Sequence, residues 1–152
     1  MRSRTLAREA ALKALYQLDL RSSVPEVDLE ELLQREAPSK DATDYAREVV
    51  QGTRKNLDRI DREIRDVAEN WDLARMAAID RNILRMAIYE MLDRQDIPPA
   101  VAINEAVTIA KKYSTKDSGG FVNGILDQVK NRLAARGQLS KAASVPEAPT
   151  EG

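Results

Sequence analysis

The chain has 152 residues, of which 43% are hydrophobic, 4% aromatic and 32% charged, and its formal net charge is -1. This length fits one domain or two small halves that share an aliphatic core, and the balanced charge attracts no nucleic acid as a whole. Because the chain has no Cys and no His, disulfides, thiol chemistry and Cys/His zinc sites are excluded. No apolar run approaches the roughly 20 residues of a membrane span, so we expect a cytoplasmic protein without metal or other cofactor.

Apolar residues at helical spacing predict three helices in the first half of the chain. The first covers residues 4–20, and the second is a short acidic helix over residues 27–36. Asp41 is expected to cap the third, a long helix whose apolar stripe runs to Trp71. Gly52 marks a kink or a close helix contact within it. The alternating charges from Arg54 to Asp66 indicate a solvated face.

In the second half of the chain, the spacing of apolar residues predicts a short connector and then three more helices. A helix over residues 78–93 is apolar around much of its girth, which is typical of a central helix. Pro99 suits the first turn of the next helix, and the last helix begins at Asp117 or Ser118.

The elements together predict an all-α fold of about seven helices, since no segment carries a strand pattern. We expect a single domain over residues 1–136, divided into helical subdomains of about 1–70 and 71–136. Residues 137–152 are small, polar and without periodicity, so they are expected to form a disordered tail.

The N-terminus carries the first candidate site. Arg2, Arg4, Arg8 and Lys13 lie on or before the first helix, where positive charge opposes the helix dipole. Arginine forks suit phosphates, so these side chains are candidates for RNA binding. Tyr16 lies two turns beyond Arg8 and could stack on a base. The alternatives are a solvated N-terminus and a half-buried core tyrosine.

The second candidate site is the joint at residues 114–124. Asp117 is predicted to cap the last helix, and Gly119 and Gly120 weaken its first turn. Close approach of a ligand would offset that weakness, and Phe121, the only Phe, follows directly. The alternative is a loop with a flexible start. The pair of glycines does not match a phosphate-binding loop.

Three carboxylates in apolar surroundings are the remaining candidates for chemistry: Asp80, Glu90 and Glu105. No two of them have a spacing peculiar to acid–base catalysis, and the di-iron helical motif needs a His. No catalytic residue is therefore predicted. The expected partners of these carboxylates are the cations Arg81, Arg85 and Lys111.

Four motifs in order resemble the bacterial NusB family of transcription antitermination factors. Ala7-Arg8-Glu9 with Ala14-Leu15-Tyr16 resembles the first helix of the family, and residues 83–90 (ILRMAIYE) resemble its central helix. VAINEA at residues 101–106 and DS-x-x-FVNG at residues 117–124 are similar to two further family motifs. The resemblance covers roughly residues 4–134.

The resemblance implies an RNA-binding factor rather than an enzyme. It implies two helical halves, boxA-type single-stranded RNA as the ligand, and the small-subunit ribosomal protein NusE as the partner. Other Nus factors and RNA polymerase complete the assembly, which acts in rRNA transcription, and some members of the family form homodimers instead. Residues of this chain at the family's RNA-contacting positions are Arg4, Arg8, Tyr16, Asp117 and Phe121. Asp80 and Asp117 fall at its partner-binding positions.

Three other functions remain open. A helical adaptor for other proteins would differ from an antitermination factor only in lacking affinity for RNA. A carboxylate-based helical enzyme has no supporting spacing. An RNA methyltransferase with a NusB-like domain would need a Rossmann segment, and this sequence contains none.

Overall fold

The computed structural model describes residues 2–21 and 23–139. The elements within this part of the chain are α1 (Arg2–Leu20), α2 (Glu26–Glu36), α3 (Lys40–Lys55), α4 (Leu57–Val67), η1 (Leu73–Arg75), α5 (Ala78–Asp93), α6 (Pro99–Tyr113) and α7 (Ser118–Ala135). These described residues contain no strand, so the predicted all-α fold is confirmed. None of their helices is both long enough and apolar enough to cross a lipid bilayer.

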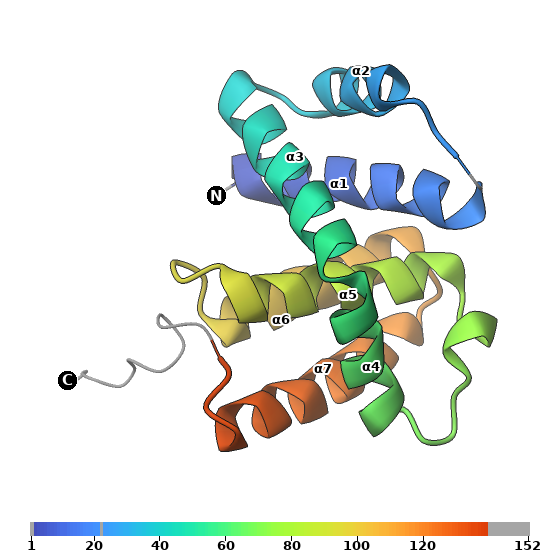
Figure 1. Ribbon diagram of the computed structural model, residues 1–152, viewed down its shortest axis with the longest axis vertical. Helices are drawn as coiled ribbons and strands as arrows, with labels where there is room; N and C mark the ends of the chain where they lie inside the picture. Colours follow the sequence, from blue (N-terminus) through green and yellow to red (C-terminus); the bar gives the residue numbers. More distant parts are fainter. Residues whose placement is uncertain (1, 22, 140–152) are drawn as a thin grey trace.

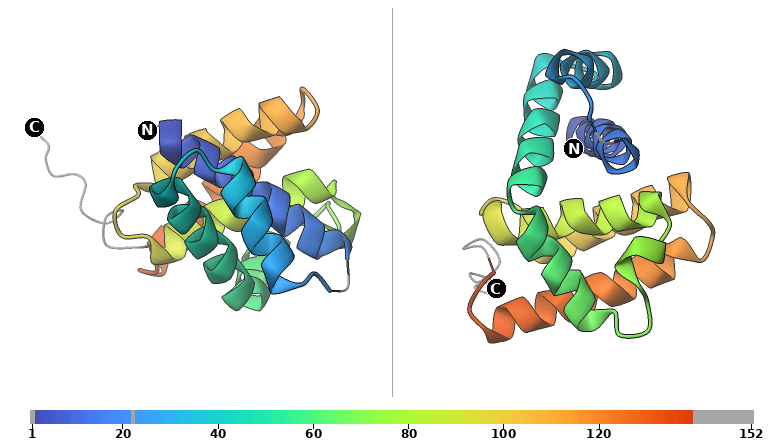
Figure 2. Two further views of the ribbon diagram at one scale, coloured as in Figure 1. Left: turned by 90° about the horizontal axis from the view of Figure 1, so that it is seen from above. Right: turned by 45° about the vertical axis from the view of Figure 1, so that its right-hand side comes forward.

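The helices form two groups that meet at α5 (Figure 1). α1, α2 and α3 pack on one another, and α6 and α7 pack together on the other side (Figure 2). α5 contacts α1, α3, α4, α6 and α7. α4 packs against α5 and α7, although it lies before residue 70. A division into subdomains near that residue stays a prediction.

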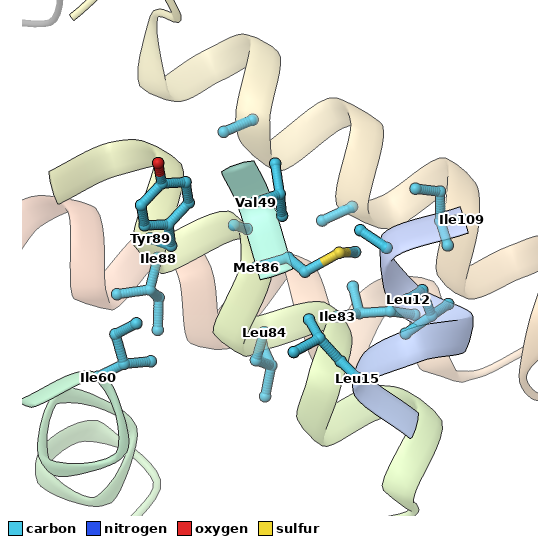
Figure 3. Packing of buried hydrophobic residues seen from close by; sticks show 14 of the residues in the cluster. Leu12, Leu15, Val49, Ile60, Ile83, Leu84, Met86, Ile88, Tyr89 and Ile109 are labelled. Atoms are coloured by element: carbon cyan, nitrogen blue, oxygen red, sulfur yellow. The ribbon is translucent and has the colours of Figure 1, made fainter. Parts of the chain in front are cut away.

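α5 is the central helix, as its apolar girth predicts. Every residue from Asn82 to Met91 is buried. Leu12 and Leu15 of α1, Val49 of α3, Ile60 of α4 and Ile109 of α6 surround it (Figure 3). Burial on all sides leaves no solvent for the polar groups of α5, so each must find a partner within the protein.

Two predictions about the third helix are wrong. Its cap is Ser39, whose hydroxyl accepts a hydrogen bond from the Ala42 amide at 3.2 Å, whereas Asp41 lies exposed in the first turn. The helix also does not run to Trp71, because it breaks at Asn56. The Asn56 side chain donates to the carbonyl of Gly52 at 2.8 Å, and asparagine is prone to such local bonds that compete with the helix.

The alternating charges of α4 are not all solvated. Asp61 is buried and accepts hydrogen bonds from Arg85 at 2.8 and 3.0 Å. Glu63 is also buried and accepts from Arg136 of the α7 end at 2.7 and 2.6 Å. The predicted solvated face is therefore correct only for the remaining charged residues of this segment.

The second half of the chain follows its predicted boundaries closely. η1 occupies the predicted connector, Pro99 lies in the first turn of α6, and α7 begins at Ser118. The amides of Gly137 and Gln138 close the end of α7 onto its last turn, with Gly137 at φ +67. Residues 140–152, most of the predicted tail, lie outside the described residues.

The sequence predicts either a kink or a close helix contact at Gly52, and the structure shows the close contact. The backbone of α3 at this point lies against the ring of Tyr89 on α5, and a Cβ added to Gly52 would overlap that ring. The distance between α3 and α5 therefore depends on the absence of a side chain at residue 52.

We predict that Gly52→Ala destabilises the protein by about 1–3 kcal/mol, because the ring of Tyr89 must shift within a packed core. Urea unfolding followed by circular dichroism measures the change. Gly124→Ala on α7 is the matched control, since a Cβ there meets no atom within 4 Å. That control should raise stability by about 0.5–1 kcal/mol through helix propensity. Equal stability of the two variants would contradict the contact.

Candidate nucleic-acid interface

A hollow of about 380 Å³ lies where η1, the start of α5 and the start of α7 meet. Its lining residues are Trp71, Arg75, Met76, Ala77, Asp80, Thr115, Asp117, Ser118 and Phe121. The Trp71 side chain is 58% exposed and meets the Phe121 ring edge to face, with centroids 5.1 Å apart. Two aromatic rings beside open space suit the stacking of an unpaired base.

Asp80 contributes a buried carboxylate to this hollow. Its Oδ2 atom accepts a hydrogen bond from the Ser118 hydroxyl at 3.1 Å. Its Oδ1 atom is buried and has no hydrogen-bond partner within the described chain. The predicted ion pair of Asp80 with Arg81, Arg85 or Lys111 is therefore wrong. A buried oxygen without a donor costs free energy, so this atom is suited to accept a hydrogen bond from a bound molecule.

Asp117 does not cap α7, which corrects the sequence-based prediction. It occupies the N-cap position, but its backbone is helical (φ -85, ψ -12) and its side chain accepts no capping hydrogen bond. The Ser118 hydroxyl instead ties the joint together through Thr115 at 3.0 Å and Ser114 at 2.9 Å. The Asp117 carboxylate is exposed and has no partner among the described residues, so it faces the hollow free for an incoming donor.

The two glycines of the joint have different surroundings. A Cβ at Gly119 would lie 3.0 Å from Cε of Lys111, so this glycine lets α6 and α7 approach each other. A Cβ at Gly120 would meet no atom within 4 Å, and Gly120 is exposed. At Gly119 the close approach is therefore between two helices of the protein itself. Only at Gly120 is there free space that a bound molecule could occupy.

A second cluster joins the middle of α1 to the end of α6. Tyr113 donates to Glu9 at 2.7 Å, and Lys112 also binds Glu9, at 3.1 Å. The ammonium groups of Lys112 and Lys13 lie 5.3 and 5.8 Å from the centroid of the Tyr113 ring. Hydrogen bonding to Glu36 raises the pKa of Lys13, so this side chain keeps its charge at neutral pH. Tyr16 is half-buried one turn further along α1.

The α1–α6 cluster and the hollow lie at the same end of the molecule. Asp19, near the end of α1, accepts from Arg81 and from Asn82 at 2.8 Å each. These two residues directly follow Asp80 on α5. The joint after Tyr113 leads straight into Ser118. The second half of α1, with Lys13 and Tyr16, therefore lies toward the same end of the bundle as Asp117 and Phe121.

Arg8 is buried rather than presented to solvent. Only 5% of it is exposed, and its Nε atom lies 2.9 Å from Glu90. Glu90 also accepts from the Tyr45 hydroxyl, and Glu105 lies 3.4 Å from the other side of the guanidinium. Burial alone would lower the pKa of Arg8, but Glu90 and Tyr45 raise it, so the side chain is a cation. In this conformation the guanidinium holds α1 on α5.

Arg4 lies at the opposite end of α5 from the hollow. It pairs with Asp96 at 3.1 Å, beyond the last turn of α5, and stacks over Tyr45. The 16 residues of α5 span about 24 Å, so Arg4 and Phe121 are not brought together. The side chain of Arg2 lies outside the described part of the structure.

The three candidate carboxylates, of which Asp80 and Glu90 are buried and Glu105 is half-buried, do not gather around one hollow. Glu90 and Glu105 both pair with Arg8 and not with the predicted cations. Asp80 is the only one of the three that lines the hollow. Among the described residues, no group of three or more acidic side chains is arranged to hold a metal ion.

Sequence reasoning overlooked several residues of this end of the molecule. Trp71 is the only Trp, but it ends an apolar stripe and resembles a core residue until its 58% exposure is known. Lys112 and Tyr113 close a helix, where cations are expected for the helix dipole. No local pattern in the sequence marks these residues, because their grouping depends on contacts between distant helices.

Comparison with known proteins matches residues 5–131 to the NusB family. The transcription antitermination protein NusB of Thermodesulfovibrio yellowstonii is 43% identical over 136 residues, which cover 83% of this chain and 90% of the relative. The solved structure of NusB from T. maritima matches with a TM-score of 0.75 and 42% identity, over 84% of this chain and 90% of that chain.

A second solved structure holds the antitermination factors NusB and NusE in complex with dsRNA. One of its chains matches with a TM-score of 0.77 and 29% identity, over 87% of this chain and 98% of that chain. The order of the motifs, the all-α architecture and these matches agree. This chain belongs to the NusB family.

Proposed function

We propose that this chain is a transcription antitermination factor that binds boxA-type single-stranded RNA together with NusE, in the cytoplasm and without catalytic activity. The observation that carries the proposal is the hollow of Trp71 and Phe121, which adjoins an unpartnered carboxylate oxygen of Asp80. The relatives named NusB and the solved NusB–NusE–RNA complex support it.

In the proposed RNA site, aromatic side chains bind bases and lysines bind phosphates. Trp71 and Phe121 stack on bases, and Tyr16 of α1 extends the aromatic surface. Three lysines contact phosphates in this proposal: Lys13, Lys111 and Lys116. Lys111 and Lys116 form no ion pair in the described structure. Because the net charge of the chain is -1, the affinity must come from this local patch.

The arginines of α1 take lesser parts in this proposal. Arg8 positions α1 on α5 through Glu90 and does not contact RNA in the conformation described. Its substitution would leave Glu90 buried without a countercharge, at a cost of about 3–5 kcal/mol, so it is a poor probe of binding. Arg4 contacts phosphates only of an RNA long enough to reach the other end of α5, and a phosphate contact of Arg2 stays a prediction from the sequence.

NusE is proposed to bind beside the RNA, through the two carboxylates of the hollow. Asp80 Oδ1 lacks a donor, and the Asp117 side chain is exposed and unpaired within residues 2–21 and 23–139. Carboxylates of this kind accept charge-assisted hydrogen bonds from a partner's backbone or basic side chains.

We predict that Phe121→Ala and Trp71→Ala each weaken binding of boxA-type RNA in the presence of NusE by roughly 5- to 150-fold, which corresponds to about 1–3 kcal/mol of base stacking. Fluorescence anisotropy with labelled RNA measures the affinity. Val101→Ala is the control, because Val101 is an exposed apolar residue at the start of α6.

The same titration separates the alternatives. If wild type binds RNA and both aromatic variants bind equally well, the hollow is not the base-binding site. If wild type binds NusE but no RNA, with or without NusE, the chain is a protein adaptor.

A second prediction concerns Tyr16. Tyr16→Ala should weaken RNA binding about fivefold or more, and Tyr16→Phe should retain it, because stacking needs the ring and not the hydroxyl. Urea unfolding of both variants separates this effect from loss of folding. Equal RNA affinity of Tyr16→Ala and wild type would remove Tyr16 from the site.

A third prediction concerns the partner. Asp80→Asn should weaken NusE binding roughly tenfold or more, because one acceptor oxygen becomes a donor and the charge is lost. Isothermal titration calorimetry without RNA measures it. Asp127→Asn on the exposed face of α7 removes the same charge elsewhere and should bind NusE like wild type. Matching losses in the two variants would show a general charge effect instead.

A further inference from the structure

The outward face of α4 is more basic than its sequence suggests. Asp61 and Glu63 turn inward, to Arg85 and Arg136. The exposed acids of α4 are Asp58, in its first turn, and Asp66, in its last turn, where it pairs with Arg132 at 3.3 Å. Against them stand five exposed cations: Arg54, Lys55, Arg59, Arg62 and Arg65. Burial of half of the acids converts a balanced sequence into a positive surface.

The cations of this face lack partners within the protein. Lys55, Arg59, Arg62 and Arg65, here called the α4 basic stripe, form no ion pair or hydrogen bond through their side chains in the described residues. Most other described cations do; the further unpaired ones are Arg21, after the end of α1, and Lys111 and Lys116, at the α6–α7 joint proposed to bind RNA. Arg59, Arg62 and Arg65 are also i, i+3 neighbours, which repel one another by a few tenths of a kcal/mol per pair, roughly. Helix stability therefore does not explain the stripe.

The stripe borders a hollow at one end, and at the other end the chain leads from it through η1 to the proposed RNA site. A surface hollow of about 460 Å³ at the α3–α4 corner is bordered by four cations, Arg54, Lys55, Arg59 and Arg62, and by one carboxylate, Asp58. At the other end, Arg65 lines a hollow together with Arg81 and Arg85, the carboxylates of Asp19, Asp61 and Asp72, and Leu73 and Ala74 of η1. The next residues, Arg75 and Met76, already line the hollow of Trp71 and Phe121. Figure 1 shows α4 leading through this connector to the start of α5.

We propose that the α4 basic stripe binds the phosphodiester backbone of RNA that extends beyond the segment held at the Trp71–Phe121 hollow. This inference rests on the proposed RNA-binding function and extends its site. The 11 residues of α4 span about 16 Å, enough to follow several phosphates of an extended strand. The stripe carries no aromatic side chain, so its contacts are electrostatic and independent of base sequence.

The experiment compares two RNAs by fluorescence anisotropy, in the presence of NusE. One is a boxA-type core, and the other is the same core with uridine flanks at both ends. Wild type should bind the flanked RNA more tightly, by about fivefold per additional phosphate contact at 0.1 M salt. The triple variant Arg59→Gln, Arg62→Gln, Arg65→Gln should lose this gain and bind the core within about twofold of wild type. Its log–log salt slope for the flanked RNA should fall by about 2.

A matched pair of single variants controls for net charge. Arg62→Glu changes the centre of the stripe, and Lys40→Glu makes the same change in charge at the start of α3, where Lys40 is 86% exposed. Since α3 has 16 residues, Lys40 lies about 24 Å from the α3–α4 corner. Arg62→Glu should reduce the affinity for flanked RNA at least fivefold more than Lys40→Glu does.

Failure of the stripe and failure of the proposed function give different results. If flanks add nothing to wild-type affinity, or if both single variants lose equally, the stripe is not an RNA surface and the proposal is overturned. If the core alone fails to bind but flanked RNA binds and the triple variant weakens it, the stripe stands and the hollow site falls. If neither RNA binds, both fall. If the stripe variants weaken NusE binding instead of RNA binding, the stripe is a protein surface and the inference is wrong.

Discussion

The structure depends on the burial of α5 on every side. A helix without a solvent face must satisfy each of its polar groups from neighbouring helices. Glu90 is satisfied by Arg8 of α1 and Tyr45 of α3, and Arg85 by Asp61 of α4. These charged contacts have definite partners and geometry, whereas apolar packing alone tolerates rearrangement. They set the direction and register of α1, α3 and α4 around α5.

The same constraint separates structural charges from available ones. Where a carboxylate turns inward to pair, as Asp61 and Glu63 do, the cations beside it on the helix surface lose their nearest countercharge. Asp80 is the exception within α5, since one of its oxygens is buried without a donor. Available charges therefore gather around the start of α5, at the joint before α7 and along α4. The first two of these places line the hollow of Trp71 and Phe121, and α4 leads toward it through the η1 connector.

Most of the fold was predictable because its signals are local. Helical periodicity, the breaks around Pro98 and Pro99, and the start of α7 each depend on a few neighbouring residues. The errors arose where a nearby residue competed for the same role. Ser39 caps α3 in place of Asp41, and Asn56 breaks a stripe that periodicity alone continues.

The candidate site was less predictable, because it depends on distant contacts. The basic residues near the N-terminus are close together in the sequence, which predicts a single binding surface. In the structure, Arg8 is buried against Glu90 and Arg4 lies at the far end of α5. Exposure of Trp71 and the inward turn of Glu63 follow from the packing of η1 and α7, which no local pattern encodes. The motif at Asp117–Phe121 does contribute to the proposed site, since Asp117, Ser118 and Phe121 line the hollow.

The edge-to-face contact of Trp71 with Phe121 gives the protein a built-in optical probe. Trp71 is the only Trp of the chain, so emission excited at the red edge of indole absorption comes from one side chain at one place. Its indole is largely exposed in the free protein, and a molecule entering the hollow replaces water around it. Occupancy of the hollow can therefore be followed in unlabelled protein.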